Sequence, residues 1–111
     1  MFSTFVVLLG ILLFFHFLAD YPLQGDFLAK AKSHVTPIAN VDWRQALFAH
    51  SFIHAGFVFL ATGQMLFFFG ELIGHAYVDY KKNAGEITFN QDQFIHFGMK
   101  FLWAVGTVFV I

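Results

Sequence analysis

Pairs of imidazole and carboxylate side chains, four residues apart, recur inside an otherwise apolar chain. The eight residues are His16 and Asp20, His50 and His54, His75 and Asp79, and Asp92 and His96. Residues at positions i and i+4 of an α-helix differ by about 40° in direction, so each pair can point to one side of its helix. Imidazole and carboxylate groups bind divalent transition metals. The pattern therefore predicts a metal site that draws ligands from four helices.

The composition is that of an integral membrane protein, so we expect the lipid bilayer to be a partner of this chain. Hydrophobic residues make up 59% of the 111 residues and charged residues only 12%, with 18 phenylalanines. Six basic side chains against seven acidic ones give no basic patch for nucleic acid, so we exclude it as a partner. The chain has no cysteine, so a metal must be bound by imidazole and carboxylate groups.

The apolar residues fall into four segments, which predict an all-α fold and a single membrane domain over residues 1–111. The predicted spans are about 2–20, 43–61, 65–80 and 91–111, with polar connectors at 21–42 and 81–90 and a short helix at 26–32. Residues 46–80 are too long for one span, so the turn is placed at 62–64. No Lys or Arg precedes the first segment, which favours a retained span over a cleaved signal peptide. Asp42 and Asn90, the latter with Gln93, are the predicted helix caps.

Alternation of these spans across the membrane predicts a four-helix bundle of two helical hairpins, in which all eight candidate ligands collect near one face. Five of the six basic residues lie on that side of the bundle: Lys30, Lys32, Arg44, Lys81 and Lys82. Positively charged connectors favour the cytoplasm. We therefore expect both termini on the non-cytoplasmic side of the inner membrane and a site that faces the cytoplasm.

Other polar residues lead to more modest expectations. Glu71 and Lys100 lie one turn beyond His75 and His96, and we expect them to form a buried ion pair, with a proton-relay role for Glu71 as the alternative. His34 has no partner at helical spacing, so it is interpreted as a solvated loop residue. Gly70 and Gly74 are spaced four residues apart, which predicts close helix packing. Trp43 and Tyr80 lie at predicted membrane interfaces and are typical of interface anchors.

Three functional hypotheses fit the predicted site. The first is a metal-dependent hydrolase of a lipid or lipid-linked phosphate, with one or two ions, zinc or iron being the first candidates. The second is a metal-ion or proton translocator that uses the same ionisable side chains. The third is a non-catalytic subunit of a homo-oligomer or larger membrane assembly, whose polar cluster is only a network of hydrogen bonds between helices.

The ordered motifs also resemble those of a bacterial and phage membrane family, domain of unknown function 3307. They are His-x3-Asp followed by Leu23-Gln24, then His-x3-His, then His-x3-Asp-Tyr-Lys81, then Asp-Gln93-x2-His. The resemblance covers nearly the whole chain. It supports a membrane location and the presence of a site, but it implies no particular reaction.

Overall fold

A computed structural model describes residues 1–111, and the chain folds into helices without any strand. The helices are α1 (Phe2–Asp20), α2 (Gly25–Ala31), α3 (Trp43–Thr62), α4 (Met65–Asn83) and α5 (Phe89–Val105), and a π-helical stretch, Gly106–Val110, continues α5. The four long helices match the four predicted apolar segments, and α2 is the predicted short helix in the first connector. The prediction of an all-α fold is confirmed.

Local sequence accounts for most of the helix ends. The Asp42 side chain caps α3 by accepting a hydrogen bond of 2.9 Å from the Arg44 backbone N–H. Hydrogen bonds from the Arg44 side chain and backbone also lower the pKa of the Asp42 carboxyl. Gly63, with φ of 70°, ends α3 in the left-handed region that glycine adopts without strain. The turn predicted between the second and third segments is therefore in the right place.

The predicted cap of the last helix was wrong by two residues. Thr88 caps α5, and its hydroxyl accepts from the Gln91 backbone N–H while the Gln91 side chain accepts from the Thr88 backbone N–H. This capping box uses the same Thr-x-x-Gln chemistry that favours helix starts generally. It leaves Asn90 outside the cap and the Gln93 side chain available for the interior.

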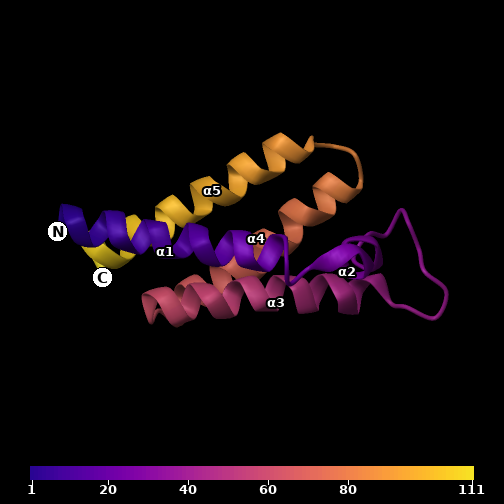
Figure 1. Cartoon of the computed structure of the whole chain (residues 1–111), viewed down its shortest axis with the longest axis horizontal. Helices are drawn as coiled ribbons and strands as arrows, with labels where there is room; N and C mark the ends of the chain where they lie inside the picture. Colours follow the sequence, from indigo (N-terminus) through magenta and orange to yellow (C-terminus); the bar gives the residue numbers. More distant parts are fainter.

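The long helices pack along one another in an elongated molecule of 49 × 23 × 22 Å. α3 packs against α4, α1 against both α3 and α5, and α5 against α4. Both termini lie at one end of the molecule, whereas α2 with its connector and the α4–α5 turn lie toward the other end (Figure 1). The linked ends of α1 and α3, and of α4 and α5, therefore share one end of the fold.

Polar residues fill the inside of this molecule and apolar residues cover the outside. Of the 24 buried residues, 14 are polar or charged, while many Phe, Leu, Ile and Val side chains are exposed. Three helices, α1, α3 and Phe89–Val110, are long and apolar enough to cross a membrane. α4 carries four charged side chains, so its composition alone does not make it a span. Polar residues inside and apolar residues outside are the reverse of the arrangement in a water-soluble protein and are consistent with a membrane protein.

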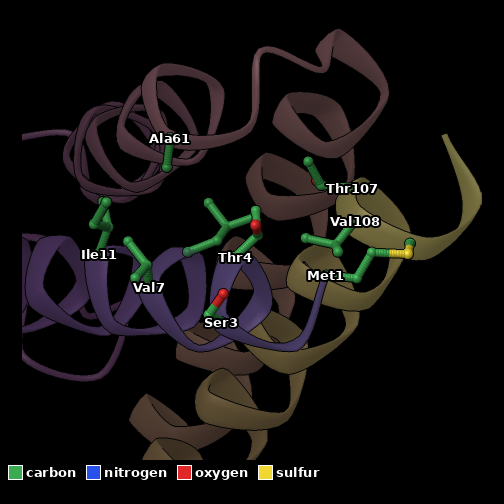
Figure 2. Close-up of a pocket in the computed structure, with 9 residues that line it drawn as sticks. Met1, Ser3, Thr4, Val7, Ile11, Ala61, Thr107 and Val108 are labelled. Carbon is green, nitrogen blue, oxygen red and sulfur yellow. The ribbon is translucent and has the colours of Figure 1, made fainter.

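An apolar core closes the end of the molecule that holds the termini. Its buried residues are Leu8, Leu12, Val58, Phe67 and Ala104. Beyond it, a cavity of about 700 Å³ opens to the surface among the first turns of α1, Ala61 of α3 and the last turn of the chain (Figure 2). Ser3, Thr4 and Thr107 are the polar residues that line this cavity. The apolar core lies between them and the buried polar residues.

The glycines of α4 allow the close approach of α5 that their spacing predicts. A Cβ atom on Gly70 would lie 2.7 Å from the Trp103 ring, and one on Gly74 would lie 2.7 Å from the Met99 methyl group. The Trp103 ring cannot bend aside as the Met99 side chain can. Helix α4 thus depends on Gly70 for its packing against α5.

We expect Gly70→Ala to lower the free energy of unfolding by about 1–3 kcal/mol, because an added methyl group overpacks this contact. Gly56→Ala is the matched control, since a Cβ atom at Gly56 meets no atom within 4 Å. That control should be neutral or slightly stabilising because alanine favours helix. Both variants are compared by denaturation of the detergent-solubilised protein, and equal effects would contradict the packing argument.

Candidate metal centre

The structure brings all eight predicted ligands together in the space between the four long helices. Their residues are almost fully buried, except for Asp20, whose side chain is 12% exposed. One group within mutual ligand distance comprises Asp20, His50, His54 and His75. An adjoining group comprises Asp79, Asp92 and His96. His16 lies outside both groups, next to Asp20.

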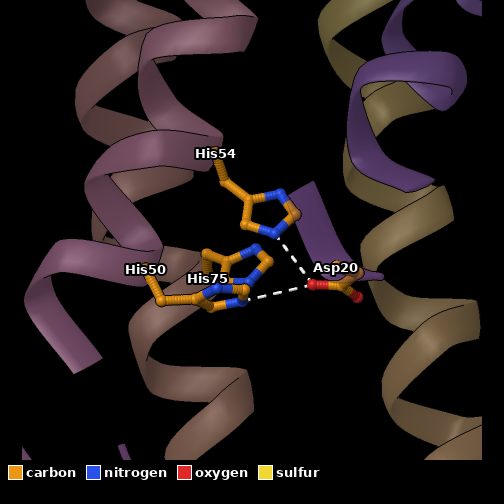
Figure 3. Close-up of side chains that lie close together, drawn as sticks. All are labelled: Asp20, His50, His54 and His75. Atoms are coloured by element: carbon orange, nitrogen blue, oxygen red, sulfur yellow. Dashed lines mark hydrogen bonds and ion pairs between the residues drawn. The ribbon is translucent and has the colours of Figure 1, made fainter. Parts of the chain in front are cut away.

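The first group has the composition of a four-ligand metal site. The Asp20 carboxylate, at the end of α1, faces histidines from α3 and α4 (Figure 3). Its Oδ1 atom lies 2.8 Å from His54 Nε2 and 3.2 Å from His50 Nε2. The four potential ligand atoms of this group all lie within 4.8 Å of one another. Three imidazoles and one carboxylate can therefore converge on one ion.

The second group lies beside the first and is joined to it by Asp79. His96 Nε2 is 3.2 Å from both Asp79 Oδ1 and Asp92 Oδ1. The other oxygen of Asp79, Oδ2, is 3.5 Å from His50 Nε2 and 3.5 Å from His75 Nε2. Asp79 thus faces both groups with different oxygens, and the two groups form one continuous cluster.

Lys32 is a member of this cluster that the sequence did not predict. Its ammonium group lies 2.7 Å from Asp79 Oδ2, and both side chains are at most 3% exposed. From sequence, Lys32 is one of several basic residues of the connector, which are expected at the membrane surface. The structure instead folds the residue after α2 back onto α4. No spacing rule could have identified this contact.

Gln93 is a second residue whose position the sequence missed. Its side-chain amide donates hydrogen bonds to Asp20 Oδ2 at 2.9 Å and to Asp92 Oδ2 at 3.1 Å. Its Oε1 atom therefore faces His16 Nε2, at 3.0 Å, and must accept from that ring. His16 Nε2 is then a donor, which also lies 3.3 Å from Asp20 Oδ2. His16 and Gln93 hold the Asp20 carboxylate in place.

The predicted ion pair between Glu71 and Lys100 is confirmed. Lys100 Nζ lies 2.7 Å from Glu71 Oε1, and both residues are at most 1% exposed. Glu71 also contacts two further groups, because Trp103 Nε1 donates to Oε1 and His75 Nδ1 lies 3.0 Å from Oε2. The pair is therefore attached directly to the candidate ligand His75.

His34 was wrongly expected to be a solvated residue without a partner. Its ring stacks on Tyr80, with centroids 4.2 Å apart and planes 11° apart, and lies 5.4 Å from the Trp43 ring. The faces of the three rings pack against one another, so His34 is less exposed to solvent than a loop histidine is expected to be. His34 thus fastens the connector to α3 and α4 outside the cluster.

A comparison with known families identifies the family to which this chain belongs. The family described as "Protein of unknown function (DUF3307)" matches residues 8–110. The chain belongs to this family. The matched range of this DUF3307 protein includes all eight candidate ligands, together with Lys32 and Gln93. No curated protein and no solved structure matches the chain.

Two buried nitrogen atoms of the DUF3307 cluster stand out because they form no hydrogen bond. His50 Nε2 and His75 Nε2 are both buried, and neither forms a hydrogen bond of good geometry, although carboxylate oxygens lie 3.2 Å and 3.5 Å away. Buried polar atoms are nearly always satisfied in folded proteins, because leaving one without a partner costs about 1–3 kcal/mol. Both atoms belong to the four-residue group around Asp20. A metal ion there would satisfy both nitrogens at once.

Two of the carboxylates buried in the cluster have no lysine partner. Four carboxylates are buried in it, those of Asp20, Glu71, Asp79 and Asp92. Lys32 neutralises Asp79 and Lys100 neutralises Glu71. Asp20 and Asp92 have no lysine partner and instead face imidazole nitrogens, Asp20 those of His50 and His54 and Asp92 that of His96. Buried charges are stable only when they are compensated, so a bound cation or protonated imidazoles would complete the balance.

Proposed function

We propose that this DUF3307 protein is an integral membrane four-helix bundle that holds one divalent transition-metal ion between Asp20, His50, His54 and His75. The observation that carries the proposal is the pair of buried Nε2 atoms, on His50 and His75, that lack hydrogen-bond partners beside the Asp20 carboxylate. The adjoining Asp79, Asp92 and His96, together with His16, surround the ion and fix its ligands.

The proposed bundle includes α4 as its fourth membrane span. Its two acidic residues within the apolar stretch, Glu71 and Asp79, both face inward and are paired with lysines. Paired charges that face the interior are the form in which membrane spans tolerate ionisable residues. Lys30, Arg44, Lys81 and Lys82 remain at the connector end of the fold, which favours the cytoplasmic side of the inner membrane for that end.

The donor set limits which metal would bind. Three imidazoles and one carboxylate suit zinc in tetrahedral geometry and also suit iron(II), whereas magnesium and calcium prefer sites made of oxygen atoms alone. Zinc and iron are therefore the proposed cofactors. We propose a single ion because the charges without a lysine partner sum to two.

Hydrolysis of a lipid or lipid-linked phosphate is the second candidate, and the exposure of Asp20 favours it. Asp20 is the ligand through which the centre reaches the surface, since its side chain is 12% exposed. A metal ion held by these four ligands would activate a water molecule for attack on a phosphate group by taking it as a fifth ligand. Transport is less well supported, because the apolar core of Leu8, Leu12, Val58, Phe67 and Ala104 separates the cluster from the terminal end.

The proposal is tested by elemental analysis of the protein purified in detergent without chelators. We expect about one zinc or iron per chain in the wild type and none in His50→Ala/His54→Ala. Ser51→Ala, between these two positions, is the control and should retain the ion. A wild type that contains no metal and binds none on addition would support the hydrogen-bond network instead.

Activity assays then separate the hydrolase from the translocator. Metal-loaded protein is assayed for phosphate release from lipid phosphates in mixed micelles, and the same preparation is assayed for proton and zinc flux in proteoliposomes. Metal-dependent phosphate release that is lost in His50→Ala/His54→Ala would support hydrolysis. Flux without phosphate release would exclude it.

A further inference from the structure

We infer that Glu71 is a positioning residue of the metal centre, which fixes the His75 ring so that its Nε2 atom faces the ion. The inference rests on the proposed function and assigns a role to a residue outside the eight predicted ligands. It also decides between the two roles considered for Glu71. The ion pair with Lys100 serves to hold Glu71 against His75.

The two oxygens of the Glu71 carboxylate make separate contacts. Oε1 forms an ion pair with Lys100 Nζ at 2.7 Å and accepts a hydrogen bond from Trp103 Nε1 at 3.0 Å. Oε2 lies 3.0 Å from His75 Nδ1. Three groups on two helices therefore fix the carboxylate, and its orientation relative to His75 is set by α5.

The contact with Oε2 determines which nitrogen of His75 carries the proton. A carboxylate paired with a lysine ammonium group is ionised and can only accept hydrogen bonds. His75 Nδ1 must therefore donate to Oε2, and the neutral ring then carries a lone pair on Nε2. That atom is buried without a hydrogen-bond partner in the group formed with Asp20, His50 and His54. Carboxylate, histidine and metal in this order form a known orienting arrangement.

The His75 ring is also held between two other imidazole rings. It is stacked between His54, with centroids 3.8 Å apart, and His96, with centroids 4.1 Å apart. By contrast, the Nδ1 atoms of His16, His50 and His96 are buried without hydrogen-bond partners. The Glu71 contact thus singles out His75 as a ligand that is fixed before metal binds.

Lys100 neutralises Glu71, so Glu71 can orient His75 without adding a negative charge to the centre. The pair is neutral as a whole, so the ion still meets the charges of Asp20 and Asp92. A proton relay would need an open acceptor on Glu71, but Oε1 is already held by the Lys100 ion pair and the Trp103 hydrogen bond, and the residue is fully buried. The geometry favours a fixed orienting group over a relay.

The test compares the wild type with Glu71→Gln/Lys100→Met, which removes both charges together and so leaves neither one buried alone. Binding of Zn²⁺ and Co²⁺ is measured, the cobalt ion serving as a spectroscopic probe of ligand geometry. We expect affinity to fall by about 10–100-fold and the cobalt spectrum to change. Trp103→Phe, which keeps the Glu71–His75 contact, is the control and should change the affinity less.

Glu71→Asp provides a second variant should the double variant fail to fold. It keeps a negative charge for Lys100 but shortens the side chain, so the oxygen withdraws from His75. The same loss of affinity is expected. Unchanged metal affinity in a folded variant, with an unchanged cobalt spectrum, would overturn the inference even if the wild type holds its metal.

A measurement without metal keeps the inference separate from the proposed function. The ¹⁵N spectrum of the His75 ring in metal-free protein should show the tautomer protonated at Nδ1, and Glu71→Gln/Lys100→Met should lose that preference. A purely structural role of the ion pair would leave the tautomer unchanged. A wild type with the expected tautomer but no metal affinity would contradict the proposed function alone.

Discussion

Lys32→Met should destabilise the protein by about 3–5 kcal/mol, since it leaves the Asp79 carboxylate buried without its cationic partner. Asp79 and Lys32 are only 3% and 2% exposed, so water cannot replace the lost ammonium group. Methionine has nearly the same length as lysine, so the loss of stability reflects the missing charge more than a newly formed cavity. The free energy of unfolding of metal-free protein in detergent measures the effect.

Lys30→Met is the matched control for this prediction. Lys30 lies in the last turn of α2, two residues before Lys32, and also pairs with an aspartate, Asp26, at 3.1 Å, but these side chains are 63% and 84% exposed. Such a surface pair contributes about 0–1 kcal/mol. If Lys32→Met cost no more than Lys30→Met, the connector would not depend on the contact with Asp79, and α2 would be less firmly attached than the structure indicates.

The sequence predicted the helices and the eight clustered residues well, because both follow from short-range rules. The run of apolar residues from 46 to 80 is too long for one span, and Gly63 supplies the left-handed turn that divides it. Once the hairpins are fixed, pairs four residues apart on each helix must face inward at the connected ends. His16, unlike the others, points its Nε2 atom to Gln93 and so lies beside the centre.

Contacts that fold the connector back onto the bundle could not be predicted in this way. Lys32 reaches Asp79 over 47 positions of sequence, and its type and surroundings are those of an ordinary basic loop residue. The stacking of His34 on Tyr80 could not be predicted either, because both contacts depend on how the connector lies on α4. Gln93 was assigned to a helix cap because two overlapping capping patterns occur, and the one at Thr88 is used.

Asp20→Asn should abolish stoichiometric metal binding and lower affinity by at least about a hundredfold, a larger loss than that of an orienting residue. The substitution keeps the shape of the side chain and removes its charge. Asp20 Oδ1 lies within 3.2 Å of both His50 Nε2 and His54 Nε2, so it is placed to bind the ion between them. Isothermal titration with Zn²⁺, combined with elemental analysis, measures both affinity and stoichiometry.

Asp92→Asn is the comparison that decides between one ion and two. Asp92 also lacks a lysine partner, but it belongs to the adjoining group with Asp79 and His96. If one ion is held by the group around Asp20, Asp92→Asn weakens binding through charge alone and keeps one equivalent. If each group holds an ion, the wild type contains two equivalents and each substitution removes one. Two equivalents in the wild type would therefore refute the single-ion proposal, and the charge balance that supports it, while leaving the metal centre in place.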